Sequence, residues 1–93
     1  MKLKDRVAIV TGAASGFGAE IARQYVAEGA KVAVADIDAA GAKAVAAQLG
    51  EAAIAVACDV SKRADVDAAV AATLARFGRI DIAVNNAGLT HRN

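Results

Sequence analysis

The sequence of 93 residues contains no proline, no tryptophan, one cysteine and one histidine. The single cysteine, Cys58, excludes an internal disulfide and a cysteine-cluster metal site, and the single histidine excludes a histidine-rich zinc site. Aromatic residues make up 3% of the chain, which argues against base-stacking surfaces for nucleic acid. The absence of proline argues against linkers and proline-rich ligand segments.

Neither sign of charge is in excess, because the formal net charge is +1. The chain therefore offers no basic field for nucleic acid or a membrane surface. It is 57% hydrophobic and 23% charged, which excludes a disordered chain. No apolar run approaches the roughly 18 residues that span a bilayer, and the first six residues lack the apolar core of a signal peptide. We expect a cytoplasmic protein with one small domain, residues 1–93.

Four short apolar runs alternate with helical patterns along the chain. The expected strands cover residues 7–10, 31–36, 53–58 and 80–84. Apolar residues recur every three or four positions between them, and the three expected helices end at Gly29, Gly50 and Gly78. This β-α-β-α-β-α-β order is typical of an α/β fold with a doubly wound parallel sheet.

The sequence also predicts capping residues and apolar faces for the expected helices. Asp38 is placed to cap the second helix and Ser61 the third. The expected apolar face of the first helix includes Phe17, Ile21 and Tyr25. The expected apolar stripe of the third helix is Val66, Val70, Leu74 and Phe77.

The strongest motif is the glycine-rich segment TGAASGFG, residues 11–18, between the first strand and the first helix. Gly12 permits a sharp turn, Gly16 leaves room for a diphosphate, and Gly18 lets the helix pack closely on the sheet. The free N–H groups at the helix N-terminus attract phosphate, and Ser15 adds a hydroxyl donor. A plain glycine-rich turn is the alternative interpretation. A P-loop is excluded because no Gly-Lys-Ser/Thr follows.

Asp36 ends the second expected strand, eighteen positions after Gly18. Dinucleotide-binding folds place an acid about 20 residues beyond their glycines to accept hydrogen bonds from the adenosine ribose. The carboxylate would repel a 2′-phosphate, and no Lys or Arg stands at Ser15 or Ile37 to neutralise it. We therefore expect NAD rather than NADP as the cofactor. The alternative is that Asp36 caps the turn that follows it.

With these motifs in place, the sequence resembles the short-chain dehydrogenase/reductase family along its whole length. Residues 11–18 match the family's TGxxxGxG, Asp59-Val60 its adenine-contacting pair, and Asn85-Asn86-Ala87-Gly88 its NNAG. Phe17 departs mildly from the family's usual Ile or Leu. The resemblance implies a partial Rossmann-type fold with strand order 3-2-1-4.

The resemblance also implies a role for each matching residue. Thr11 and Asn85 would tie the sheet and loops together, and for Asp59 a plain turn role stays open. The residues implied around the cofactor are Gly12, Ser15, Gly16, Phe17 and Gly18 at the pyrophosphate, Asp36 and Ile37 at the adenosine ribose, Asp59 and Val60 at the adenine, and Asn86, Ala87 and Gly88 near the nicotinamide ribose.

The family's catalytic Ser and Tyr-x-x-x-Lys lie downstream of NNAG, and no such set occurs in this chain. Its single tyrosine, Tyr25, is followed four residues later by Gly29. We therefore expect the NAD-binding portion of an oxidoreductase that transfers hydride between nicotinamide and an alcohol or carbonyl, inactive by itself. A stand-alone, non-catalytic nucleotide-binding module is the alternative. We also expect self-association, because the fourth strand would form an uncovered sheet edge.

Overall fold

A computed structural model describes residues 2–86 of the chain. The four strands form one parallel sheet in the order β3-β2-β1-β4, which confirms the predicted fold class and strand order. The elements are β1 (Val7–Thr11), α1 (Gly16–Ala27), β2 (Lys31–Asp36), α2 (Ala39–Leu49), the short 3-10 helix η1 (Gly50–Ala52), β3 (Ala53–Ala57), α3 (Arg63–Phe77) and β4 (Ile82–Asn85). Within residues 2–86, no helix combines the length and hydropathy needed to cross a membrane.

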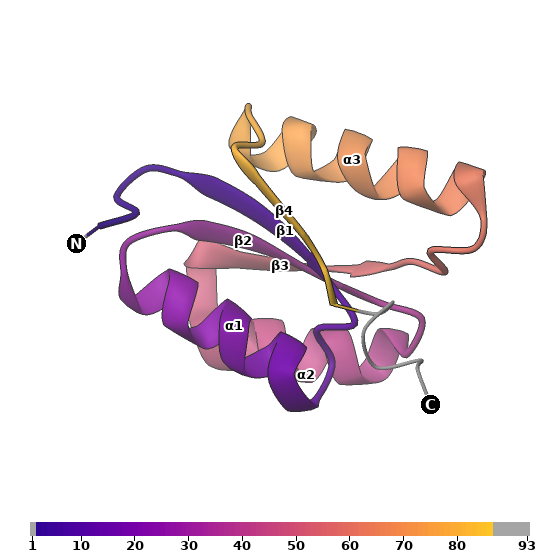
Figure 1. The fold of residues 1–93 in the computed structure, drawn as a ribbon, viewed down its shortest axis with the longest axis horizontal. Coiled ribbons are helices and arrows are strands. Elements are labelled where there is room, and N and C mark those ends of the chain that lie inside the picture. Colours follow the sequence, from indigo (N-terminus) through magenta and orange to yellow (C-terminus); the bar gives the residue numbers. More distant parts are fainter. Residues whose placement is uncertain (1, 87–93) are drawn as a thin grey trace.

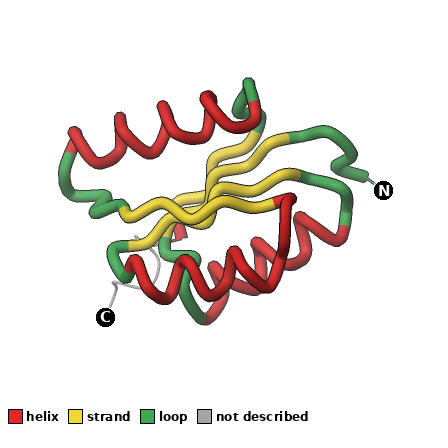
Figure 2. Tube along the Cα trace, turned by 180° about the vertical axis from the view of Figure 1, so that it is seen from behind, coloured by secondary structure: helices red, strands yellow, loops and turns green. Residues whose placement is uncertain are grey.

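Helices cover both faces of the sheet, with α1 and α2 on one face and α3 on the other (Figures 1 and 2). Because side chains alternate along a strand, β1 and β2 contribute to both layers. Val10, Val32 and Val34 face α1 and α2 and are fully buried there. Ile9 and Ala33 belong to the smaller cluster that α3 covers. The central strands are therefore continuous apolar runs.

The helical faces are built from smaller residues than the sequence pattern indicates. In α3 the buried positions are Ala69 and Thr73, and the Thr73 hydroxyl donates to the Ala69 carbonyl at 2.7 Å. Leu74, expected on the apolar stripe, is 44% exposed, and Phe17 of α1 is 78% exposed. The expectation that these two side chains are buried was therefore wrong, and the positions of α3 that face the sheet are Ala69 and Thr73.

Several element boundaries also differ from the expected ones. Strands β1 and β4 end one residue later, at Thr11 and Asn85, β3 ends one residue earlier, at Ala57, and the C-cap of α1 is Glu28 rather than Gly29. Helix α3 is capped by Lys62 rather than Ser61, without a side-chain capping bond. The Ser61 amide and hydroxyl instead donate to Asp59 Oδ1, so the serine belongs to a turn before the helix. Strand β4 begins at Ile82, two residues later than expected, because Asp81 uses its side chain to bind β1.

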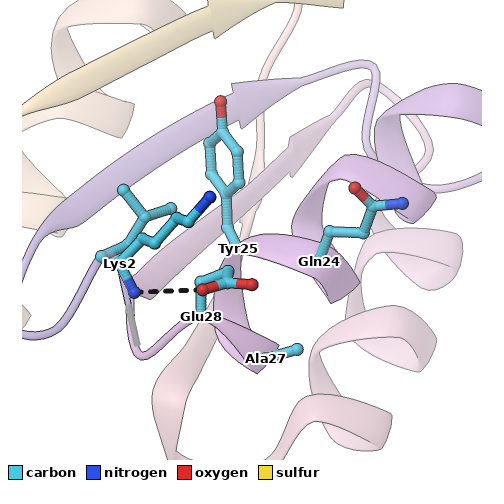
Figure 3. A pocket seen from close by; sticks show the side chains of 6 residues that line it. Lys2, Gln24, Tyr25, Ala27 and Glu28 are labelled. Atoms are coloured by element: carbon cyan, nitrogen blue, oxygen red, sulfur yellow. Dashed lines mark hydrogen bonds between the residues drawn. The ribbon is translucent and has the colours of Figure 1, made fainter.

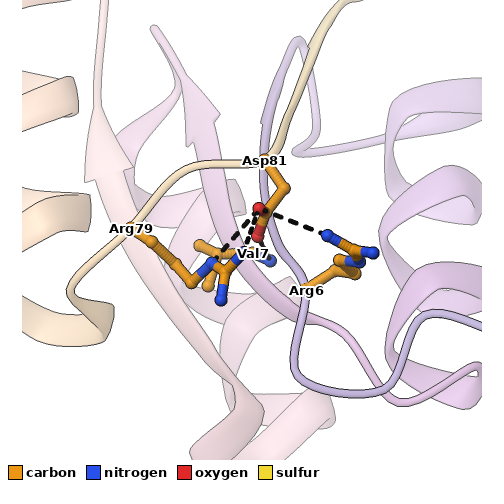
Figure 4. A network of polar contacts seen from close by, with 4 residues as sticks. All are labelled: Arg6, Val7, Arg79 and Asp81. Atoms are coloured by element: carbon orange, nitrogen blue, oxygen red, sulfur yellow. Dashed lines mark hydrogen bonds and ion pairs between the residues drawn. The ribbon is translucent and has the colours of Figure 1, made fainter.

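Asp81 fastens the beginning of β4 to the beginning of β1 (Figure 4). Its amide donates to the Val7 carbonyl at 2.8 Å, and its Oδ2 accepts from the Val7 amide at 2.9 Å. Arg79 Nη2 lies 2.7 Å and Arg6 Nη1 3.7 Å from Oδ1. The Arg79 hydrogen bond, followed by that of Val7, holds the pKa of the Asp81 carboxyl below its usual range. The amide and carboxylate of Asp81 thus continue the β1–β4 pairing beyond Ala8 and Ile82, the first pair in register.

We expect Asp81→Asn to lower the free energy of unfolding at neutral pH, because it removes the charge that Arg79 and Arg6 face. A carboxyl whose folded-state pKa is lowered stabilises the fold above its unfolded pKa of about 4, and this contribution is lost as the pH falls through the lower, folded-state value. Urea unfolding at neutral pH and near pH 3 measures the difference between variant and parent.

The matched control is Asp67→Asn, which removes an exposed carboxylate paired with Arg63 within α3. Exposed pairs of this kind contribute little to stability. We expect Asp81→Asn to lower the free energy of unfolding more at neutral pH than near pH 3. Asp67→Asn should change it little at either pH. An equal, pH-independent penalty in both variants would contradict this role for Asp81.

Candidate cofactor-binding site

The loops that follow β1, β2 and β3 all leave the sheet at the carboxyl ends of its strands. In the parallel register Thr11 pairs with Ala35, and Asp36 pairs with Ala57, so the three strands end together. The chain order reverses at β1, which has β2 on one side and β4 on the other. Open parallel sheets bind ligands in the crevice at such a reversal.

The glycine-rich loop is held against β2 before it turns into α1. The Ala13 amide donates to the Ala35 carbonyl at 3.1 Å, which extends the β1–β2 pairing past the end of β1. Gly12 and Gly16 both have positive φ, 65° and 61°. L-residues with a side chain rarely adopt this conformation, so the loop's path requires glycine at these two positions.

Gly18 is the point of closest approach between α1 and the loop. A Cβ at this position would overlap the Gly12 carbonyl group and lie 2.8 Å from Asn86 Nδ2. That amide is 2% exposed and donates to the Gly12 carbonyl oxygen at 3.2 Å. The Thr11 hydroxyl donates to Asn85 Oδ1 at 3.0 Å, in agreement with the tying role expected for this pair. The loop is therefore braced from β4 as well as from β2.

The N-terminus of α1 is open to an anion, whereas that of α2 is closed. Ser15 stands at the α1 N-cap without a side-chain capping bond, and the first turn contains no acidic residue. In α2, Asp38 Oδ1 accepts from the Gly41 amide at 3.0 Å, which confirms the expected cap. A Cβ added at Gly16 would meet nothing within 4 Å. The first N–H groups of α1 have no intrahelical acceptor, so this open space suits a phosphate group.

Asp36 lies directly beside the glycine-rich loop. Its Oδ2 accepts from the Ala14 amide at 2.9 Å, and its Oδ1 accepts from the Asp38 amide at 2.9 Å. The structure therefore brings together the two features on which the cofactor hypothesis rests. The second bond also makes Asp36 a cap of the following turn, as the alternative interpretation holds. The contact with Ala14 was not predicted from the sequence. The position of Asp36, an acid at the carboxyl end of the strand next to β1, could have predicted it.

Asp59 is engaged in its own turn. Its Oδ1 accepts from both the amide and the hydroxyl of Ser61, at 2.9 and 2.6 Å, and its amide donates to Asp65 Oδ2 at 2.9 Å. The Ser61 hydrogen bonds hold the pKa of the Asp59 carboxyl below its usual range. Burial, with the charges of Asp65 and Asp59, raises the pKa of the neighbouring Cys58 thiol. Cys58 itself is buried and packs in the cluster that α3 covers.

Exposed apolar side chains follow the carboxyl ends of three of the strands. Three of the exposed large hydrophobic residues follow the ends of β1, β2 and β3: Phe17, Ile37 and Val60, which are 78%, 71% and 40% exposed. Each of the three follows a strand end that lies beside the glycine-rich loop or Asp36. All three belong to the residue set that the sequence assigns to the cofactor. Ala87 and Gly88 of that set lie outside the described residues.

Tyr25 lies at the opposite end of the sheet from the glycine-rich loop. It lines a surface pocket of about 360 Å³ beside the C-terminal end of α1, together with Lys2, Gln24 and Glu28 (Figure 3). The Lys2 amide donates to Glu28 Oε1 at 3.0 Å and closes the pocket's rim. The single tyrosine of the sequence is therefore remote from the residues of the candidate site.

A glycine-rich loop, an open helix N-terminus and an acid at the end of the neighbouring strand define a dinucleotide-binding α/β domain. The family model described as short chain dehydrogenase matches residues 6–93. The chain belongs to this family, whose members bind nicotinamide dinucleotide cofactors.

Among curated relatives, the chain is 51% identical to sorbitol dehydrogenase of Cereibacter sphaeroides and 54% identical to D-threitol dehydrogenase of Mycolicibacterium smegmatis. These alignments cover 96% and 95% of this chain but 35% of each relative. The chain thus spans about a third of the length of the relatives that it matches.

A solved structure of 3-ketoacyl-(acyl-carrier-protein) reductase from Brucella melitensis, complexed with NADH, matches with a TM-score of 0.86 and 54% identity, over 87% of this chain and 34% of that one. A hydroxysteroid dehydrogenase from Escherichia coli matches with the same TM-score and 34% identity, over 90% and 37% of the two chains. The predicted family resemblance is therefore confirmed by both sequence and fold.

Gly18→Ala and Gly16→Ala test the packing of the loop. Gly18→Ala is expected to lower the free energy of unfolding by about 3 kcal/mol, because its methyl group displaces the Gly12 carbonyl and the Asn86 amide. Gly16→Ala is expected to cost about 1 kcal/mol, from backbone strain in open space. Chemical denaturation without ligand measures both. Equal losses in the two variants would show that α1 does not require close contact at Gly18.

Proposed function

We propose that residues 1–93 form the cofactor-binding half-domain of an NAD-dependent short-chain oxidoreductase. The hydrogen bond from the Ala14 amide to Asp36 Oδ2 carries the proposal, because it brings a phosphate loop and a ribose acceptor to one site. The open N-terminus of α1 and the apolar side chains around it support the same assignment.

Each part of the cofactor has a corresponding part of the chain in this proposal. The diphosphate lies at the N-terminus of α1, and Asp36 accepts from the adenosine ribose. Ile37 and Val60 supply apolar surface at the adenosine end, with Asp59 beside them. The residues proposed to hold the cofactor are Gly12, Ser15, Gly16, Phe17, Gly18, Asp36, Ile37, Asp59, Val60, Asn86, Ala87 and Gly88.

When bound, the nicotinamide supplies the hydride chemistry between an alcohol and a carbonyl. The described residues of this chain bind and orient the cofactor. The family's catalytic Tyr-x-x-x-Lys has no counterpart here, and Tyr25 lies at the far end of the sheet. The relatives' names include dehydrogenases of sorbitol, D-threitol and hydroxysteroids, so the proposal extends to alcohol and carbonyl substrates as a class.

We propose NAD rather than NADP because Asp36 places a negative charge where a 2′-phosphate would lie. Within the described residues, the neighbouring Ile37 and Ser15 carry no charge that would offset it. The Brucella melitensis reductase, whose structure was solved with NADH, supports this preference by its similarity.

We expect wild-type protein to bind NAD at least about tenfold more tightly than NADP, and Ile37→Arg to reduce this ratio about tenfold. Ile37 is 71% exposed, so an arginine fits there without repacking and pairs with the 2′-phosphate. Calorimetric titration with both cofactors measures the ratio, and raised salt should weaken the gain.

The control is Leu74→Arg, which adds the same charge on α3, where the parent leucine is 44% exposed. It should leave the NAD/NADP ratio unchanged. If both arginine variants shift the ratio equally, the effect comes from net charge, and the assignment of the ribose position to Asp36 and Ile37 fails.

The coding sequence decides between the enzyme proposal and the alternative of a stand-alone binding module. A coding sequence that continues past Asn93 into a Tyr-x-x-x-Lys motif supports the enzyme, and oxidation of an alcohol with formation of NADH by the encoded protein tests it. Turnover by the 93-residue polypeptide itself would contradict the proposal that its catalytic groups lie elsewhere.

We expect the 93-residue polypeptide, produced by itself, to self-associate. Within residues 2–86, β4 pairs with β1 on one side and with no strand on the other. An apolar cavity of about 290 Å³ lies beside it, lined by Ile9, Val60, Val66, Val70 and Val84 among others. Such edges invite pairing. Sedimentation velocity measures the outcome, and a stable monodisperse monomer would contradict it.

A further inference from the structure

The Asp36 carboxylate joins two loops that are distant in sequence. Asp38, which donates to its Oδ1, is two residues away, so that bond belongs to a local turn. Ala14, which donates to its Oδ2 at 2.9 Å, is 22 residues away. No local turn requires this second bond. The carboxylate therefore also holds a distant loop, which a residue that only caps its own turn does not do.

Ala14 is the point at which the loop leaves the sheet. The amide before it, that of Ala13, still donates to a β2 carbonyl, and two residues after it Gly16 turns with a φ of 61°. The first turn of α2 passes close to Ala14, because a Cβ added at Gly41 would lie 2.9 Å from the Ala14 Cβ. The position of Ala14 thus fixes where Ser15 and the N-terminus of α1 begin.

We propose that Asp36 is a positioning residue for the diphosphate-binding loop, in addition to its proposed contact with the ribose. The inference rests on the proposed function. By holding the Ala14 amide, the carboxylate fixes the direction in which the α1 N–H groups point. A carboxylate offers about four acceptor positions, so two backbone amides leave room for ribose hydroxyls.

The two tasks are physically coupled. Hydrogen bonds from an amide to a charged carboxylate are stronger than those between neutral groups. Loss of the bond between Ala14 and Asp36 would free the loop next to the N–H groups that must converge on the phosphate. Removing the carboxylate should therefore weaken the diphosphate contact even for a ligand that has no ribose hydroxyls for Asp36 to bind.

A ligand comparison separates the two tasks. Two ligands are compared: NAD, and an NAD analogue whose adenosine ribose lacks its 2′- and 3′-hydroxyls. Each is titrated into the full-length gene product, both wild type and the Asp36→Ala variant. We expect Asp36→Ala to bind the dideoxy analogue about tenfold more weakly than wild type does, and NAD more weakly still. Equal affinity of both forms for the analogue would overturn the positioning role.

The matched control is Asp38→Ala, which removes the α2 cap but keeps the backbone amide that Asp36 accepts from. It should bind the dideoxy analogue as wild type does. If Asp38→Ala loses as much affinity as Asp36→Ala, general weakening of the fold explains the loss and the inference fails. Should Asp36→Ala not fold by circular dichroism, Asp36→Asn replaces it, with a smaller loss expected in the same direction.

Hydrogen exchange without cofactor provides a readout that is independent of binding. The Ala14 amide should exchange at least about tenfold faster in Asp36→Ala than in wild type, while the Val10 amide in β1 keeps its protection. Unchanged Ala14 exchange would overturn the inference. Wild-type protein that binds neither NAD nor its analogue would overturn the proposed function instead, and the exchange result would still decide whether Asp36 positions the loop.

Discussion

The pairing of β1 with β2 is the constraint on which the other features depend. Its register continues past the strand itself, since the Ala13 amide reaches the Ala35 carbonyl. This one added bond places Ala14 next to Asp36 and delivers the glycine-rich turn to the end of β2. A shift of one residue would turn Val10 and Val34 away from α1 and α2 and would also separate the loop from its acid. The core and the candidate site are therefore specified by the same register.

Close packing makes this register useful for binding. Gly18 lets α1 approach the Gly12 carbonyl, and Asn86 reaches the same carbonyl from the end of β4. Two segments, α1 and the end of β4, thus converge on one peptide group of the loop. The helix dipole and N–H groups are consequently aimed by contacts that exist before any ligand arrives.

The sequence predicted the fold because each strand contains a continuous apolar run and each helix is followed within two residues by a glycine. It also predicted the glycine-rich loop and Asp36 as neighbours, since parallel strands end at one edge. It failed at Leu74, Phe17 and Ser61 for local reasons. Periodicity marks large apolar residues as buried, but the positions of α3 that face the sheet are occupied by alanine and threonine. Ser61 favours a cap in isolation, yet the Asp59 carboxylate two residues earlier competes for its amide and hydroxyl.

Within residues 2–86, the two faces of the sheet are packed unequally. The α1 and α2 face contains the larger cluster of buried residues and carries the loop that would hold the diphosphate. The α3 face has the smaller cluster and leaves an apolar cavity beside Val60 and Val84. A charged group is held most effectively by dipoles that need not reorganise, and the hydrogen bonds to Gly12, Ala13 and Ala14 hold the loop in place on this face. Apolar contacts are less directional, so the Val60 side of the proposed site depends less on such fixed geometry.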